Sequence, residues 1–207
     1  LMPADLHLHS VFSDGTFTPK EIVERACSIG LDTLALTDHD TVGGWGEMKL
    51  YCQSAEIRWE PGIELSTSHA GREIHLLGYF SSNELTVLPE KLGAFQERRR
   101  NRVQEIIIQL RDSGVHWDVD QVYDNIECQS PGRPHVARAL VEHGVVSNVS
   151  NAFRKYLVKD KPGWVPSNYP STVEMIQAIH ADHGLAVLAH PGLGVPNEML
   201  TDLASQG

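Results

Sequence analysis

The sequence predicts an α/β fold, because short strand patterns alternate with helical patterns along much of its 207 residues. This alternation runs through residues 1–90 and returns in residues 165–207, whereas residues 91–164 have helical patterns and no convincing strand. Apolar residues make up 41% of the chain, too large a share for a disordered protein, so a sizeable core can form. We therefore expect a largely parallel sheet interrupted by an inserted helical subdomain.

The expected strands are short, and each has either a period-two alternation or a compact apolar run. A turn over residues 68–71 separates the third strand from the fourth. Five strands are too few to close a barrel, so we expect an incomplete sheet. The strands are predicted at residues 4–9, 33–37, 57–65, 73–80 and 186–189.

The first helix has the clearest predicted boundaries. Thr18-Pro19-Lys20-Glu21 has the form of a capping box with proline at the first helical position, and Gly30 supplies the stop. The other helices are less clearly capped and follow from the spacing of their apolar residues. They are predicted at residues 45–55, 89–112, 118–125, 134–143, 148–157 and 171–183.

The charge is divided unevenly along the chain. The net charge of −10 argues against a protein that coats duplex DNA, and no apolar run is long enough to span a membrane. Residues 91–161, however, hold 12 of the 17 Lys and Arg residues and only 9 of the 27 Asp and Glu residues, a net charge of +3 that leaves −13 on the rest. This division suits metal binding in the acidic part and anion binding in the basic part. The odd number of cysteines, 3, favours reduced thiols in a cytoplasmic protein.

Histidine and carboxylate side chains recur at or near the carboxyl ends of the predicted strands, where α/β proteins build their sites. His7 and His9 are two residues apart on the first strand and therefore face the same side. Asp14 follows the first strand, and His39 and Glu64 come at the ends of the second and third strands. His75 lies within the fourth strand, and His190 follows the fifth. The full set is His7, His9, Asp14, His39, Glu64, His75 and His190.

Several of these residues, and Asp40 beside them, also have an ordinary explanation. Asp14 precedes a glycine and suits a turn, Asp40 suits a helix cap, and His75 lies in an apolar run where a hydrogen-bonded core residue is common. Together the set is more informative, because imidazole and carboxylate donors suit Mn²⁺, Zn²⁺ or Fe²⁺ better than Mg²⁺ or Ca²⁺. Seven donors exceed one tetrahedral site and indicate two or three divalent ions.

In this order, the motifs DLHLHS-x-x-SDG, TDHD, GIE, IHLLGY and AHP resemble the polymerase and histidinol phosphatase (PHP) family. The motifs ERRRNR (97–102), SPGRPHVARALVEHG (130–144) and AFRKYL (152–157) resemble its narrower TrpH/YciV-type branch. That branch includes a 3′,5′-nucleotide bisphosphate phosphatase and a 5′→3′ exoribonuclease.

This resemblance implies a distorted, TIM-like (β/α)₇ PHP barrel with an all-helical insertion. It also makes the seven residues ligands of two or three divalent ions, with Mn²⁺ as the first choice. The family's final Asp-x-His motif has no match after His190, so we expect the C-terminal part of the barrel to be missing here.

The basic insertion contains candidate phosphate contacts. Arg133-Pro134-His135 at a predicted helix start offers a guanidinium, an imidazole and backbone N–H groups, and Ser130 adds a hydroxyl. By spacing, Arg99 shares a helix face with Arg102, and the family resemblance favours Arg99 as a further phosphate contact.

The expected activity is metal-dependent hydrolysis of a phosphate ester. Its expected substrate is a nucleotide bisphosphate, which would lose its 3′-phosphate, or the 5′ end of a short RNA, which would lose nucleotides 5′→3′. Glu64 would bridge two ions, with His7 and His9 on one and His75 and His190 on the other.

Asp14 and His39 would hold a third ion or orient the phosphate, so the expected catalytic set is Asp14, His39 and Glu64. The alternatives are an amidohydrolase-type hydrolase, a histidinol-phosphatase-like small-molecule phosphatase, and a non-catalytic PHP module like those attached to some polymerases. No pattern in the sequence indicates an oligomeric state.

Overall fold

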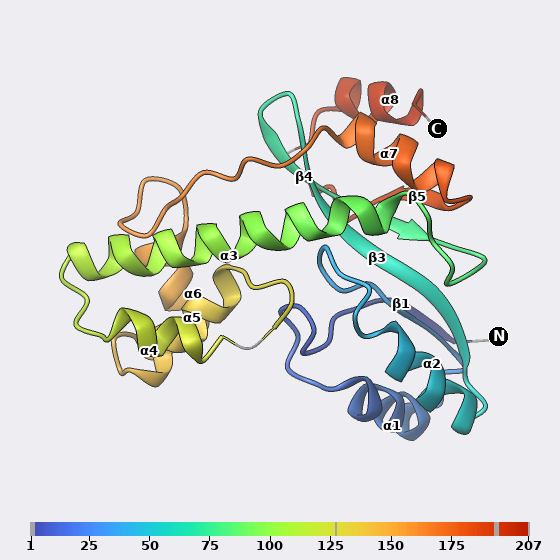
Figure 1. Cartoon of the computed structure of the whole chain (residues 1–207), viewed down its shortest axis with the longest axis horizontal. Helices are drawn as coiled ribbons and strands as arrows, with labels where there is room; N and C mark the ends of the chain where they lie inside the picture. The colour runs from blue at the N-terminus through green and yellow to red at the C-terminus, as the bar shows by residue number, and fades with distance from the viewer. Residues whose placement is uncertain (1–2, 127, 193–194, 207) are drawn as a thin grey trace. The chain divides into compact units, whose positions relative to one another are not determined.

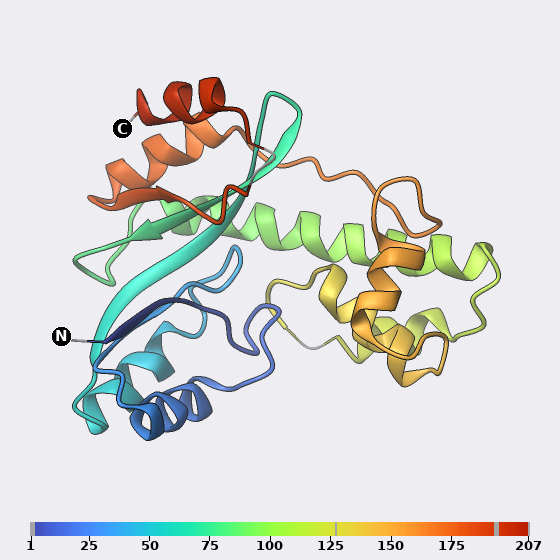
Figure 2. The ribbon, with the colours of Figure 1, turned by 180° about the vertical axis from the view of Figure 1, so that it is seen from behind.

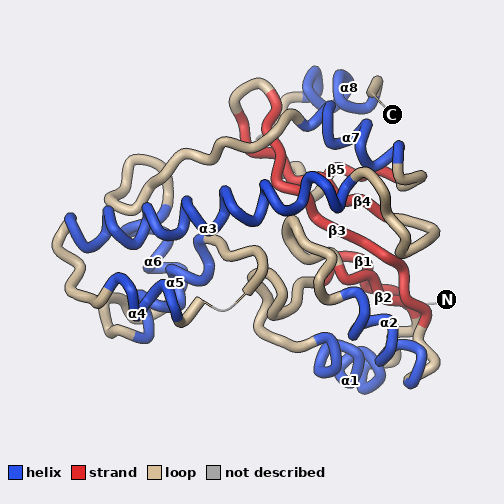
Figure 3. The backbone as a smooth tube through the Cα atoms, viewed as in Figure 1, coloured by secondary structure: helices blue, strands red, loops and turns tan. Residues whose placement is uncertain are grey.

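The computed structural model describes residues 3–126, 128–192 and 195–206 of the chain. These described residues form two compact units, one within residues 1–95 and 168–207 and the other within residues 96–167. All named strands lie in the first unit, and the second is helical, as the colours of Figure 3 show. None of the helices in these described ranges is both long enough and apolar enough to cross a membrane.

The first unit contains one five-stranded sheet in the order β1-β2-β3-β4-β5. The β1–β2 and β2–β3 pairs are parallel, whereas the β3–β4 and β4–β5 pairs are antiparallel. The α/β class is therefore confirmed, but the expected largely parallel sheet was wrong. The strands are β1 (Ala4–Leu8), β2 (Thr33–Leu36), β3 (Arg58–His69), β4 (Arg72–Tyr79) and β5 (Leu185–Leu188).

A tight hairpin reverses β4. Only Ala70 and Gly71 separate β3 from β4, and their φ angles are +48° and +74°. Two consecutive positive φ values form the turn that joins antiparallel strands with a two-residue loop, and so short a link cannot join parallel strands. Because β5 is antiparallel to β4, it runs in the same direction as β1, β2 and β3. The described strands form an open sheet, and the seven-stranded barrel stays a prediction.

Helices cover the sheet in two groups, which can be followed in Figures 1 and 2. Helices α1 and α2 pack with β2 around a core that includes Leu34, Leu36 and Met48. Helix α7 packs with β3, β4 and the first turns of α3 around a second core that includes Ile63 and Ile179. These helices are α1 (Pro19–Ile29), α2 (Trp45–Ser54), α3 (Leu88–Asp112) and α7 (Thr172–Ala181).

The predicted boundaries of α1 are confirmed. Thr18 Oγ1 accepts the backbone N–H of Glu21 at 3.3 Å, and Glu21 Oε2 accepts the backbone N–H of Thr18 at 2.8 Å. Gly30 ends the helix with a φ of +76°, a left-handed conformation that glycine adopts without strain.

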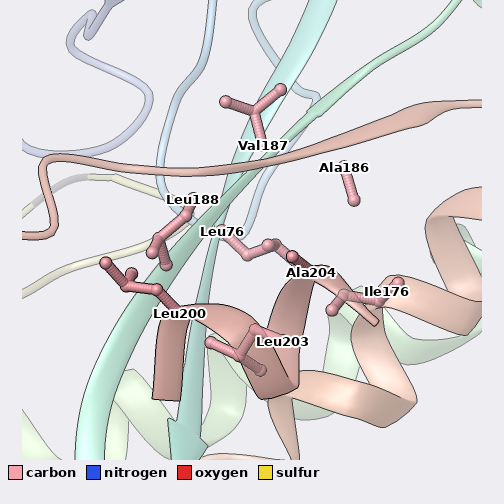
Figure 4. Close-up of a pocket in the computed structure, with 8 residues that line it drawn as sticks. All are labelled: Leu76, Ile176, Ala186, Val187, Leu188, Leu200, Leu203 and Ala204. Carbon is pink, nitrogen blue, oxygen red and sulfur yellow. The ribbon is translucent and has the colours of Figure 1, made fainter. Parts of the chain in front are cut away.

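A last helix, α8 (Asn197–Ala204), follows β5 and was not predicted. Its Leu200 and Leu203 face β5 and α7 across an apolar pocket of about 430 Å³ (Figure 4). Leu76 of β4 also lines this pocket. Neighbouring residues of a strand face opposite sides, so the pocket and His75 lie on opposite faces of the sheet.

The second unit has its own apolar core. Its helices surround Ile106, Leu110, Val136 and Leu140, all of which are fully buried. The unit contains the rest of α3, then α4 (Val119–Asp124), α5 (Arg133–Glu142), α6 (Val149–Ala152) and the π-helical segment η1 (Phe153–Leu157).

Candidate metal centre

A buried carboxylate lies at the centre of the candidate site. Glu64 belongs to β3, and only 1% of its side chain is exposed. Its Oε2 lies 2.8 Å from His7 Nε2 and 2.9 Å from His9 Nε2. Its Oε1 lies 2.9 Å from His75 Nδ1 and 2.9 Å from His190 Nε2. Each carboxylate oxygen therefore contacts a different pair of imidazoles.

The imidazoles around Glu64 come from β1 and the residue directly after it, from β4 and from the segments that follow β2 and β5. The period-two alternation of β1 points His7 and His9 toward the same side. His39 follows β2 and forms an isolated parallel bridge with Glu64, with its Nδ1 3.7 Å from Glu64 Oε2. His190 follows β5, which runs in the same direction as β1 and β2, so it reaches the same edge of the sheet.

Two of the expected positions were wrong. Glu64 does not end its strand, because β3 continues to His69 and pairs with β4 beyond the point where β2 ends. His75 does not lie at the carboxyl end of β4 but in its first half, opposite Ser66 in the antiparallel register. Since β4 runs in reverse, its first half lies beside the carboxyl end of β3, and this brings His75 to Glu64.

Asp14 lies beside His9 and His39 of the cluster. Its Oδ1 lies 3.5 Å from His9 Nδ1, and its Oδ2 lies 3.8 Å from His39 Nε2. The structure thus gathers all seven residues that the sequence analysis grouped as candidate ligands. His190 is the most accessible of the five histidines, with 59% of its side chain exposed.

A buried network that the sequence analysis missed supports the loop after β1. Asp38 accepts hydrogen bonds from the backbone N–H of Ser10 at 2.7 Å, from Ser10 Oγ at 2.6 Å and from Ser13 Oγ at 2.6 Å. This fixes the loop that carries Asp14. Burial raises the pKa of Asp38 above its usual value, although the serine hydrogen bonds oppose this shift. The three consecutive ionisable residues at 38–40 indicated in the sequence that this segment has a role, but they did not show that Ser10 and Ser13 are the partners of Asp38.

Asp40 has a different role from the expected helix cap. Its Oδ1 accepts the backbone N–H of Ser66 at 2.7 Å, and its own N–H donates to the carbonyl of Glu64 at 2.9 Å. Its φ is +52°, an uncommon conformation for a residue other than glycine. Helix α2 is instead preceded by Gly44 at its N-cap, without a side-chain cap. Asp40 therefore holds the strand segment that presents Glu64.

Charge interactions shift the pKa values inside the cluster. Burial alone would raise the pKa of Glu64, but hydrogen bonds with His7, His75 and His9 outweigh it and hold the pKa far below the usual range. Burial lowers the pKa of His75, yet contacts with Glu64 and Glu73 raise it overall to about 9. The pKa of His9 is raised too, because its hydrogen bond with Glu64 and the nearby Asp14 carboxylate exceed the effect of burial.

The donor chemistry of the cluster fits divalent metal ions. Two groups of ligand atoms lie close enough to share an ion, namely His7, Glu64 and His190, and His9, His39 and Glu64. His190 also contacts Glu64 Oε1, the oxygen that His75 contacts, and the centroids of the His75 and His190 rings are 5.2 Å apart. This exposed imidazole therefore lies beside both His7 and His75. Nitrogen and carboxylate donors that converge in this way are typical of Zn²⁺, Mn²⁺ and Fe²⁺ sites.

The residues expected to contact phosphate belong to the second unit. Arg99 of α3 is only 8% exposed, and its Nη1 donates to the carbonyl of Pro131 at 3.4 Å. Ser130 is fully buried. Arg102, expected on the same helix face as Arg99, donates through Nε to the carbonyl of Val165 at 3.1 Å. Arg99 and Ser130 are therefore part of the interior of this unit.

Arg133 and His135 lie in the first turn of α5. The Arg133 guanidinium lies 5.9 Å from the ring centroid of Trp164, in cation–π contact. His135 Nδ1 accepts the backbone N–H of Gly132 at 3.1 Å, and its Nε2 lies 3.4 Å from Cys128 Sγ. Both ring nitrogens of His135 thus have neighbours within the unit.

Comparison with known proteins assigns the chain to a family. The PHP domain pattern matches residues 5–105. A 5′-3′ exoribonuclease of Haemophilus influenzae is 36% identical over 190 residues, which cover 90% of this chain and 68% of that protein. The chain belongs to the PHP domain family.

Other PHP relatives point to phosphate chemistry. A 3′,5′-nucleoside bisphosphate phosphatase of Chromobacterium violaceum is 36% identical over 191 residues, covering 91% of this chain and 66% of that protein. The crystal structure of a candidate metal-dependent phosphoesterase from Bifidobacterium adolescentis superposes with a TM-score of 0.90 at 28% identity, covering all of this chain and 75% of the other. This PHP chain spans about two thirds of the length of the two curated relatives.

Proposed function

We propose that this chain hydrolyses a phosphate ester of a nucleotide in a metal-dependent reaction. The observation that carries the proposal is Glu64, whose two carboxylate oxygens each contact a separate pair of histidines. Relatives named as an exoribonuclease and as a bisphosphate phosphatase support this reaction class.

Two or three divalent ions are proposed for the cluster. Mn²⁺ is the first choice and Zn²⁺ or Fe²⁺ are alternatives, because the donors combine imidazoles with carboxylates. When bound, such ions lower the pKa of water and neutralise charge on phosphoryl oxygens. The proposed ligands are His7, His9, Asp14, His39, Glu64, His75 and His190.

The contacts of Glu64 support an assignment of the ligands to separate ions. Glu64 presents one oxygen to His7 and His9 and the other to His75 and His190, as a carboxylate shared by two ions would. The ligand atoms within reach of a single ion are those of His7, Glu64 and His190 and those of His9, His39 and Glu64, so His190 and His39 could each complete a site. Asp14 and His39 form the remaining corner, where they would hold a third ion or orient the phosphate. The catalytic set proposed from these contacts is Glu64, Asp14 and His39.

The basic residues of the second unit support a substrate with a second phosphate. A guanidinium can hold two phosphate oxygens at once, and Arg133 lies in the first turn of the ten-residue helix α5, where the helix dipole favours an anion. We assign direct phosphate contact to Arg133, and a supporting role to the buried Arg99 and Ser130 and to His135, whose ring nitrogens have neighbours within the unit. Residues 1–90 and 165–207 would then supply the metal-binding part and residues 91–164 the substrate-binding part. The substrate would be a 3′,5′-bisphosphonucleoside or the 5′ end of a short RNA.

The first experiment tests the reaction class. Mn²⁺-loaded protein is assayed with a 3′,5′-bisphosphonucleoside, with a short 5′-phosphorylated RNA and with an N-acetylated substrate. We expect hydrolysis of a phosphate ester and none of the amide, and we expect Glu64→Gln to abolish it. Glu60→Gln is the matched control, because Glu60 lies on the same strand and pairs with Arg58 outside the cluster. Bound metal without release of phosphate or nucleotide would overturn the proposal and favour a non-catalytic module.

The second experiment tests the phosphate-binding role of Arg133. Arg133→Ala is expected to raise the KM for a bisphosphonucleoside far more than the KM for a simple aryl phosphate, because only the former has a second phosphate. Arg111→Ala is the control, since Arg111 lies in the same unit and pairs with the neighbouring Asp112 on the surface. Equal effects of Arg133→Ala on both substrates would contradict this role.

A further inference from the structure

The ring of His75 lies between two carboxylates. Its Nδ1 is 2.9 Å from Oε1 of Glu64, and its Nε2 is 3.2 Å from Oε1 of Glu73. Glu73 and His75 are two residues apart on β4 and therefore share a face of the strand. Both side chains are largely buried, with 23% of Glu73 and 21% of His75 exposed. The sequence analysis gave Glu73 no role.

This arrangement distinguishes the two nitrogens of the ring. An imidazole binds a metal ion only through a nitrogen that carries no proton, and an acceptor beside the other nitrogen decides which one that is. Beside His75, the acceptor outside the cluster is Glu73, and the nitrogen directed into the cluster is Nδ1. For comparison, Nδ1 of His9 lies 3.5 Å from Ser13 Oγ and 3.5 Å from Asp14 Oδ1, longer than either contact of the His75 ring.

We propose that Glu73 is a positioning residue that holds the proton of His75 on Nε2, so that Nδ1 is the nitrogen offered to a divalent ion beside Glu64. The inference rests on the proposed metal-dependent function and goes beyond it, because it assigns a residue outside the ligand set. Glu73 also fixes the rotation of the ring, since a hydrogen bond to Nε2 opposes a flip that would exchange the two nitrogens. An ordinary surface ion pair would have neither effect and would contribute little.

The first test measures metal affinity. Mn²⁺ is titrated calorimetrically into metal-free protein, and Glu73→Ala is expected to raise the Kd by about 10-fold to 100-fold, the usual cost of losing the partner of a ligating histidine. Glu73→Gln is expected to raise it less, because the amide oxygen still accepts a hydrogen bond. Glu60→Ala is the control, because Glu60 has a similarly exposed side chain, 29%, but pairs with Arg58 instead of a candidate ligand.

A double-mutant cycle separates positioning from a general effect on charge or folding. If Glu73 acts through His75, adding Glu73→Ala to His75→Ala weakens Mn²⁺ binding no further than His75→Ala alone. Losses that add would show that Glu73 acts independently and would overturn the inference. Wild-type protein that binds no Mn²⁺ would instead overturn the proposed function itself, so the two failures are distinguishable.

A third measurement is made on the wild-type protein and tests the position of the His75 proton even if Glu73→Ala fails to fold. Zinc-loaded wild-type protein is diamagnetic, so long-range ¹H–¹⁵N correlation spectra can identify the protonated nitrogen of each histidine. The signal of His75 is assigned by its absence in His75→Gln. We expect the proton on Nε2, and a His75 protonated on Nδ1 would overturn the proposal.

Discussion

The carboxylate of Asp182 stabilises the start of α3 from outside that helix. Its oxygens accept the backbone N–H groups of Thr86 at 2.7 Å, Val87 at 2.9 Å and Leu88 at 2.8 Å, and also the hydroxyl of Thr86 at 2.9 Å. The first N–H groups of a helix have no partner within it, so a carboxylate from the end of α7 satisfies them. Burial would raise the pKa of Asp182, but these hydrogen bonds from Leu88, Val87 and Thr86 lower it overall.

Asp182→Ala is expected to lower the free energy of unfolding by about 1–3 kcal/mol at neutral pH, because it leaves several N–H groups without an acceptor. Since the folded pKa lies below the ordinary value of about 3.9, the contribution of the charge is complete above about pH 4 and is lost as the pH falls through the folded pKa. Urea unfolding from neutral to acid pH should therefore show the wild type and the variant converging in acid.

Asp112→Ala is the control for this comparison. Asp112 has a 61% exposed side chain that pairs only with its neighbour Arg111 among the ion pairs of the described residues. We expect a change within about 0.5 kcal/mol. A constant difference between wild type and Asp182→Ala at every pH would show that the carboxylate does not act through its charge.

For individual residues, the sequence predicted which side chains lie together at the candidate site, but not the hydrogen bonds that hold them in place. The alternation of His7 and His9, and the positions of His39 and His190 after strands, follow from short patterns. The hydrogen bonds from Ser10 to Asp38 join residues 28 positions apart, and no local pattern indicates such a pair. Glu73 was visible as a neighbour of His75 on one strand face, but its role depends on the rotation of the His75 ring, which only the folded structure shows.

At the scale of elements, β3 changes partners along its length. Its first four residues, Arg58–Pro61, pair in parallel with β2, and the part from Gly62 onward pairs antiparallel with β4. A Cβ atom at Gly62 would lie 2.8 Å from Cγ2 of Thr37, which is itself fully buried. The carbonyl of Gly62 also accepts the indole N–H of Trp45 at 2.8 Å. Gly62 thus permits a close strand approach two residues before Glu64.

Gly62→Ala is expected to destabilise the protein by about 1–3 kcal/mol, because the added methyl group must displace a buried, branched side chain. The same displacement is expected to weaken Mn²⁺ binding through the neighbouring Glu64. Gly46→Ala is the matched control: Gly46 lies within α2 with nothing within 4 Å of an added Cβ, so we expect stabilisation by about 0.5–1 kcal/mol. Thermal unfolding and calorimetric titration measure both effects, and a Gly62→Ala variant as stable as Gly46→Ala would contradict the steric argument.

The positions of most elements could be predicted, and so could the direction of β4, which the sequence analysis nevertheless missed; the existence of α8 could not. Helix α1 has caps at both ends, and α3 has a long apolar stripe, so local chemistry places them. The short turn over residues 68–71 is compatible only with antiparallel strands, because a parallel pair needs a crossover of about a dozen residues or more, so the expectation of a largely parallel sheet overlooked a signal that the sequence contains. Helix α8 has three apolar residues, Met199, Leu200 and Leu203, at helical spacing, a signal too short to distinguish from chance.

At the scale of the whole molecule, the metal cluster and the basic helices belong to separately packed units. The first unit has two apolar cores beside the sheet, and the second has one core around α3 and α5. The candidate ligands come only from the first unit, and they include segments far apart in the sequence, from His7 to His190. A bound ion would therefore link distant parts of one unit without a ligand from the other.

Metal removal is consequently expected to loosen the two units unequally. An ion at a free concentration of 100 times its Kd stabilises the state that binds it by about 2.7 kcal/mol, and a chelator removes this contribution. Hydrogen exchange with Mn²⁺ and with a chelator should show faster exchange in β1, in residues 37–41 and in β3 when the metal is absent. Peptides from α5 and η1 serve as the internal control and should exchange at the same rate in both conditions. An equal acceleration in both units would show that they unfold as one cooperative body, and an acceleration confined to the second unit would place the metal outside the histidine cluster.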